Sequence, residues 1–195
     1  MKKSYCIIIL LLTTLGCIAQ NDTIKQGYDD IEDLNSQIEE HKIVDLQYID
    51  STFSYRVTVP SWLTLIETND PMLFGGIFPE VDGVENAVLI RGFSKSEFKN
   101  FAEFKDIYLT GNRFGQPVKW GSEQIWYGQN DLVNITDGVK QKVFIMWKNL
   151  IYHNQFVLLE SQTAFLWIQF TASPETYDQN IGKFNEFMNG LVLMK

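Results

Sequence analysis

Side chains able to do nucleophilic, acid–base or metal chemistry are few in this sequence and lie far apart. The chain has two histidines, His41 and His153, and two cysteines, Cys6 and Cys17. A zinc site needs histidine, cysteine or carboxylate ligands at short, regular spacings, and no such spacing occurs. No serine stands in a G-x-S-x-G elbow either. We therefore expect a protein that is not an enzyme and that uses no cofactor and no metal.

The most available carboxylates are Glu80, Asp82 and Glu85, in the segment FPEVDGVEN. Two carboxylates on either side of a sugar can hydrolyse a glycosidic bond, and their pairing is spatial, so a hydrolase stays as an alternative. The pair Asp82-Gly83 is nevertheless typical of a turn. We expect this segment to connect two strands.

Aromatic residues in a polar segment supply a different kind of candidate site. Trp120, Trp126 and Tyr127 stand among Gly, Gln and Asn in RFGQPVKWGSEQIWYGQND. Such rings give a large contact area at low entropic cost, so they can anchor a protein partner or stack on a sugar. These three residues are our candidate partner or ligand surface. The alternative is that they pack into the core.

The N-terminus is typical of an export signal. Lys2 and Lys3 precede an apolar run over 5–15, which is too short for the roughly 20 residues that span a bilayer. Small residues before Gln20 predict a signal peptide over 1–19. Alternatively, Leu15-Gly16-Cys17 is a lipobox in which Cys17 is acylated, although Thr14 stands where the motif has Leu. Both interpretations export the chain, to the periplasm or medium in the first case and to the outer membrane as a lipoprotein in the second.

Signal cleavage changes the inventory of the chain. Cleavage after residue 19 removes Cys6 and Cys17, which excludes disulfides from the mature protein. It also removes Lys2 and Lys3, leaving 14 basic residues against 24 acidic ones, a net charge of −10. This charge argues against nucleic acid and anionic lipid surfaces as partners, so we expect membrane contact only through the signal or a lipid anchor.

Residues 20–42 form a polar, acidic leader that we expect to be solvated. Its acids lack the spacing and the turn glycine of a calcium-binding EF-hand loop. The remaining residues, 43–195, have a length suited to one domain, which we expect to be monomeric.

Alternating patterns predict the strands of this domain. They lie over 43–50, 52–60, 87–93, 140–147, 155–161 and 164–172. The segment LIYHNQF is expected to turn between two of them, exposing His153. Pro60 should end its strand, with Trp62 folding back as a core anchor.

Two helices are predicted, over 94–111 and 173–190. Ser94 or Ser96 can cap the first; Ser173 and Pro174 begin the second, which Gly190 ends. Several strands are apolar on both faces and must be covered on both. The sequence therefore predicts an α+β fold, a three-layer α/β/α sandwich with a mainly antiparallel sheet.

The segments FSYRVTVPSWL and LWIQFTASPETYDQNIGKFNEFMNGL, in this order, resemble the PsbP/DcrB-like superfamily. The resemblance covers roughly residues 43–195. It departs from the family at the end, where Gly190-Leu191-Val192-Leu193 replaces the usual Ser-Phe. The resemblance implies the α/β/α sandwich and a non-catalytic accessory role, through contacts with an envelope or extracellular protein that it does not identify. A glycan- or lipid-binding carrier is the alternative.

Overall fold

The computed structural model describes residues 46–70, 73–110, 112–113, 116–117 and 124–194, with side chains outside 110–129. The predicted signal peptide, the leader, Cys17 and Trp120 therefore lie outside the described residues. Among the helices that are described, none combines the length and apolar character needed to cross a membrane.

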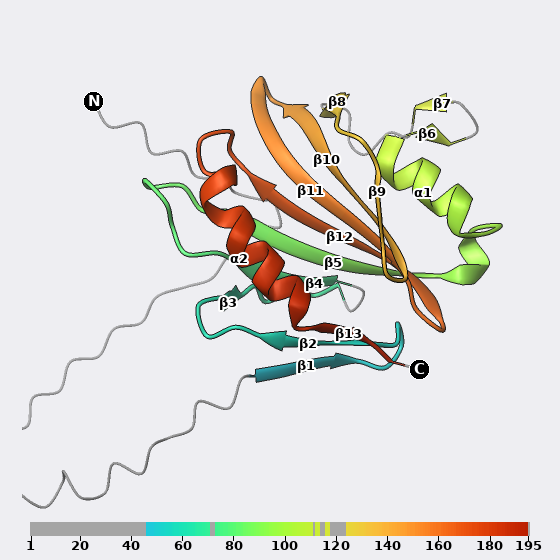
Figure 1. Cartoon of the computed structure of the whole chain (residues 1–195). Helices are drawn as coiled ribbons and strands as arrows, with labels where there is room; N and C mark the ends of the chain where they lie inside the picture. Colours follow the sequence, from blue (N-terminus) through green and yellow to red (C-terminus); the bar gives the residue numbers. More distant parts are fainter. Residues whose placement is uncertain (1–45, 71–72, 111, 114–115, 118–123, 195) are drawn as a thin grey trace, which may run out of the picture. The chain divides into compact units, whose positions relative to one another are not determined.

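A small antiparallel sheet opens and closes the domain. The predicted hairpin near the start is present, and its second strand also pairs with the last strand of the chain (Figure 1). The order is β1 (Leu46–Asp50), β2 (Tyr55–Val59) and β13 (Leu191–Leu193). The two ends of the domain are therefore held in one sheet, with β1 and β13 as its edges.

The large sheet has eight strands, and every pairing in it is antiparallel. In spatial order it contains β3 (Thr64–Leu65), β4 (Leu73–Ile77), β5 (Ala87–Ser94), β12 (Ala164–Ala172), β11 (Leu150–Glu160), β10 (Gly138–Trp147) and β8 (Gln124–Gln129), with β9 (Val133–Ile135) also on β10. A separate short ribbon pairs β6 (Asn112–Arg113) with β7 (Gln116–Pro117).

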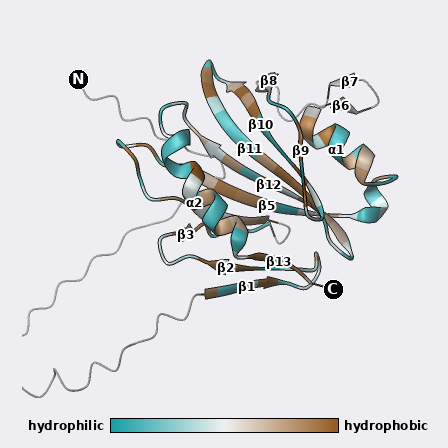
Figure 2. Cartoon of the chain, viewed as in Figure 1, coloured by the Kyte–Doolittle hydropathy of each residue, from teal (hydrophilic) through white to brown (hydrophobic). Residues whose placement is uncertain are grey.

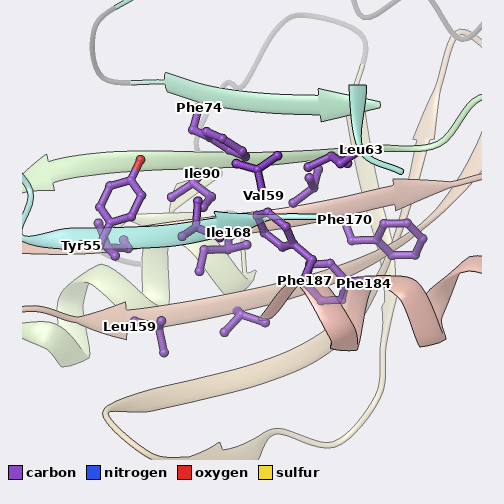
Figure 3. Packing of buried hydrophobic residues seen from close by; sticks show 14 of the residues in the cluster. Tyr55, Val59, Leu63, Phe74, Ile90, Leu159, Ile168, Phe170, Phe184 and Phe187 are labelled. Carbon is purple, nitrogen blue, oxygen red and sulfur yellow. The ribbon is translucent and has the colours of Figure 1, made fainter. Parts of the chain in front are cut away.

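Helices cover the large sheet on both faces, as the apolar strands require. Helix α2 (Tyr177–Asn189) and the small sheet pack on one face, and α1 (Phe101–Thr110) packs on the other (Figure 1). Along β12, Leu166, Ile168 and Phe170 lie in the cluster under α2, whereas Phe165 lies in the cluster under α1. Figure 3 shows part of the first cluster, in which Phe170 and Phe184 stack with ring centroids 5.2 Å apart. The predicted three-layer α/β/α sandwich is confirmed.

The structure differs from the sequence prediction at His153 and after Gly190. His153 does not lie in an exposed turn, because β11 runs from Leu150 through His153 and the hairpin turns earlier, at Lys148-Asn149. Both turn residues have positive φ, 49° and 63°, as the type I′ turn of a two-residue hairpin requires. Residues 191–193, for which no strand was predicted after Gly190, form β13. Trp62 packs at the edge of the first core cluster and is only partly buried.

The helices begin later than their capping residues suggested. Ser94 caps a short 3₁₀ helix, η1 (Lys95–Glu97), with a complete capping box, and α1 starts only at Phe101. Ser173 starts the turn before α2, where its carbonyl accepts from Tyr177 N–H at 3.0 Å. Gly190 ends α2 as predicted.

Candidate binding surfaces

A groove of about 1120 Å³ lies at one end of the domain, and we call it the end groove. It is bordered by the β9–β10 turn, the β11–β12 turn, the first half of α1 and β13. Its apolar lining includes the following residues: Phe101, Ile135, Val139, Leu159, Met188, Leu191, Leu193 and Met194.

The floor of the end groove is continuous with the first hydrophobic core. Leu159 belongs to that core, and Ile135, Leu191 and Leu193 are partly buried against it. In Figure 2, β13 is coloured as apolar along its length. Residues of the first core cluster are therefore accessible in the end groove, between the small sheet and one end of the large sheet.

The charges around the end groove are not all paired. Lys95 Nζ lies 2.8 Å from Glu160 Oε1. Lys105 Nζ lies 5.7 Å from the centroid of the Phe101 ring, and it forms no ion pair with any carboxylate of the described part of the chain. Beyond the Lys95–Glu160 pair, the lining of the end groove therefore carries one cation, Lys105, on α1 and one carboxylate, Asp137, at the β9–β10 turn.

A second surface lies on the α2 side of the large sheet, and its residues belong to neither core cluster, although Tyr177 of the first cluster borders it. It consists of three cross-strand pairs of β10 and β11, which we call the platform: Lys142–Gln155, Phe144–His153 and Met146–Ile151. The Phe144 and His153 rings meet edge to face, with centroids 4.8 Å apart. Ile151 is 45% exposed, and the other platform residues are half-buried. The platform therefore presents apolar and polarizable groups beside a cation.

Tyr177, the first residue of α2, borders the platform. Its hydroxyl donates to Gln155 Oε1 at 3.1 Å, and Lys142 Nζ lies 3.8 Å from the centroid of its ring. Burial, together with the charge of Asp178, raises the pKa of Tyr177 to about 12, so this hydroxyl stays protonated as a donor at neutral pH. The contacts hold Lys142 over the ring.

The surroundings of His153 favour its neutral form. Burial lowers its pKa below 6.5, and repulsion from Lys142 lowers it further, while Asp178 and Glu175 act in the opposite direction. Its ring also meets Tyr177 edge to face at 5.6 Å. A neutral imidazole has both a donor and an acceptor nitrogen, which suits a polar contact at an otherwise apolar surface. Sequence reasoning missed this site because it placed His153 in a turn.

The predicted aromatic surface is only partly within the described residues. Trp126 and Tyr127 lie on β8, the edge strand beside β10, although their side chains and all of Trp120 are outside the description. Pairing joins Trp126 to Ile145 and Gly128 to Phe144, so Tyr127 is the extra residue of a β-bulge. The backbone of β8 thus borders the platform at Phe144. Trp120, Trp126 and Tyr127 stay a predicted surface.

The carboxylates considered for hydrolysis lie in a turn, as predicted. Val81 and Val84 bridge across Asp82-Gly83, where φ is 52° and 78°. Among the described residues, no group of three or more histidine, cysteine or acidic side chains could hold a metal ion.

Comparison with solved structures supports the fold. The chain is similar to cyanobacterial PsbP (CyanoP) from Synechocystis sp. PCC 6803, with a TM-score of 0.50 and 7% identity over 77% of this chain and 94% of that one. The protein PA94 of Pseudomonas aeruginosa matches with a TM-score of 0.49 and 16% identity, over 68% of this chain and 98% of that one. LpqN of Mycobacterium tuberculosis matches with a TM-score of 0.44 and 12% identity, over 80% of this chain and 88% of that one.

No family model matches the chain, and no curated protein matches it in sequence. The identities to solved structures are low, so the similarity concerns the fold alone. The predicted PsbP/DcrB-like fold is confirmed at that level.

Proposed function

We propose that this protein is an exported, non-catalytic accessory protein that binds another envelope or extracellular protein through the platform. The observation that carries the proposal is the pairing of Phe144, Met146, Ile151 and His153 on the α2 side of the large sheet, outside both core clusters. Apolar side chains on such a sheet face remain in contact with water until a binding partner covers them.

The chemistry of the platform suits a protein partner better than a glycan. Methionine adapts its shape to an apolar surface, and an exposed isoleucine contributes to binding mainly when a partner removes it from water. Protein interfaces have apolar, aromatic centres with charged groups at the rim, and here Lys142 stands at the rim. The backbone of β8, which carries the predicted aromatic residues Trp126 and Tyr127, pairs with β10 beside the platform.

Export is the second part of the proposal, and it depends on the N-terminal signal. We expect the chain to be cleaved before Gln20 or, alternatively, to carry a lipid on Cys17. The intact mass of the protein recovered from the envelope distinguishes the two, because acylation adds the mass of the lipid at Cys17. Recovery of the uncleaved chain from the cytoplasm would contradict export.

Affinity capture from the native envelope tests the binding function. The full chain is expressed with a C-terminal tag, captured, and compared with Ile151→Asp, which puts a charge on the most exposed apolar residue of the platform. We expect one or more proteins to be retained by the unmodified chain and lost with Ile151→Asp. Ile49→Asp is the matched control, because Ile49 is 61% exposed on β1, remote in the topology from β10 and β11. Equal capture by both variants would refute the platform as the binding surface.

A further inference from the structure

The outer edge of β13, which lines the end groove, has backbone groups that bond no other described residue of the chain. Thr58 N–H donates to Gly190 O at 3.0 Å, and Met194 N–H donates to Ser54 O at 2.8 Å. Since an antiparallel ladder alternates, the intervening Leu191 and Leu193 direct their N–H and C=O groups away from β2. Within the part of the chain that the structure describes, no strand pairs with that side of β13.

The side chains of β13 alternate between the core and solvent, as those of a strand within a sheet do. Leu191 and Leu193 are partly buried against the core, whereas Val192 between them is 44% exposed. The floor of the end groove is apolar, and Lys105 stands on α1 at its border. A ligand in this position would meet a row of backbone donors and acceptors, an apolar floor and one cation.

We propose that the end groove binds an extended segment of a partner protein, which adds to the small sheet as a strand beside β13. Its backbone pairs with Leu191 and Leu193, its alternate apolar side chains lie on the groove floor, and an acidic residue pairs with Lys105. Backbone groups in the spacing of a strand are recognised by another strand, which is the basis of β-strand addition.

The charges favour a different protein over a second copy of this chain. Each copy of the exported chain, without Lys2 and Lys3, carries a net charge of −10, so two copies brought together at this edge repel one another. A lipid would fill the apolar floor but would leave the N–H groups of Leu191 and Leu193 without acceptors along the edge. This inference concerns a surface separate from the platform, and its test is independent of the proposed function.

Selection from a phage-displayed library of random twelve-residue peptides on the full exported protein supplies the probe. We expect the selected peptides to alternate apolar and polar residues and to share an acidic position. A synthetic peptide of that consensus should slow hydrogen exchange at the amides of Leu191 and Leu193 by about tenfold or more, since these become bonded. Thr58 and Met194 are already bonded and serve as internal references.

Three variants locate the peptide. Leu193→Pro removes an N–H that faces the end groove and none that bonds β2, and it should weaken peptide binding by about fivefold or more. Lys105→Glu should weaken binding by about two- to tenfold and shift a new selection toward basic residues. Lys183→Glu on α2 lies outside the end groove and is the matched charge control, while Ile151→Asp on the platform should bind the peptide as the unmodified chain does.

Thermal unfolding shows whether Leu193→Pro folds. If it does not, the test of the proposal depends on peptide binding by Lys105→Glu and on amide hydrogen exchange at Leu191 and Leu193 in the unmodified chain. Four outcomes would overturn the proposal. They are the absence of any selected peptide, a peptide that leaves both leucine amides unprotected, a lipid copurifying in stoichiometric amount, and a dimer that Lys105→Glu or Leu193→Pro dissociates. None of these bears on capture through the platform.

Discussion

The ring of Phe53 packs directly on Gly92, so that a β-carbon at Gly92 would lie 2.2 Å from Phe53 Cγ. Phe53 lies in the β1–β2 turn and is buried, and Gly92 is on β5 of the large sheet. The absence of a side chain at Gly92 therefore lets the turn of the small sheet rest on the backbone of the large one. The turn that leads into β2 thus packs on β5, and β2 in turn pairs with β13, which lines the end groove.

Gly92→Ala should destabilise the domain. The new methyl group forces the Phe53 ring to move, and overpacking of this kind costs about 1–3 kcal/mol. Urea unfolding followed by circular dichroism measures the loss. Gly182→Ala is the matched control: no atom lies within 4 Å of a β-carbon there, so this helical position should gain about 0.5–1 kcal/mol. Equal stability of the two variants would contradict the packing of Phe53 on Gly92.

Ser161→Ala should also loosen the attachment of the β1–β2 turn. Ser161 Oγ is buried 2.8 Å from the Phe53 carbonyl oxygen, and it accepts a hydrogen bond from Ala164 N–H at 3.0 Å. The substitution leaves buried backbone groups without a partner, which costs about 1–3 kcal/mol. Thermal unfolding measures the change, and Ser96→Ala, at an exposed position, is the control. A loss no larger than that of Ser96→Ala would show that Ser161 does not hold the turn.

The stability of the domain should fall when His153 is forced to take up a proton. Its pKa in the folded protein is below 6.5, chiefly because of burial and secondarily because of Lys142. As the pH falls below 6.5, the unfolded chain therefore binds a proton at His153 before the folded chain does. The free energy of unfolding decreases until the pH reaches the pKa of His153 in the folded protein. As the pH rises again between these two pKa values, the lost stability is regained. His153→Gln should remove this part of the pH dependence.

His41→Gln is the matched control, because the chain has only these two histidines. Lys142→Gln should raise the pKa of His153 toward 6.5, measured by NMR titration of the imidazole protons, because a repelling charge is removed. A pKa that stays unchanged in Lys142→Gln would show that burial alone sets it.

Trp62 should contribute mainly through packing and little through its hydrogen bond. Its ring centroid lies 5.2 Å from that of Phe78, and Nε1 donates to Glu186 Oε1 at 3.1 Å on an exposed surface. Trp62→Phe should cost less than about 1 kcal/mol, since a surface hydrogen bond exchanges with water. Trp62→Ala should lower the free energy of unfolding by about 2–4 kcal/mol, because the partly buried indole ring and its packing contacts are removed. Urea unfolding compares them; equal losses would mean that the hydrogen bond dominates.

Local patterns were sufficient for most of the framework. The alternation in Tyr55–Val59 predicted β2, and the apolar positions on both faces of Ala164–Ala172 predicted helices on each side of the sheet. Asp82-Gly83 predicted its turn. These predictions succeeded because strand alternation, turn conformation and two-sided burial are encoded by neighbouring residues.

The candidate sites were not predictable in the same way. His153 was placed in a turn because LIYHNQF has a weak pattern of its own; only its pairing with Phe144 on β10 makes it part of a strand. Leu191–Leu193 follows a helix directly, and only pairing with β2, more than a hundred residues earlier, makes it β13.

The sequence by itself determined the fold class, the two-sided sheet and the expectation of export, because each depends on residues close together in the chain. The tertiary structure decided which apolar residues stay outside the core. The platform lies on the β10–β11 hairpin, and it stays outside the core because α2 and the small sheet cover other parts of that face. The end groove lies where β13, which pairs with the distant β2, meets the end of the large sheet, and such contacts exist only in the folded chain.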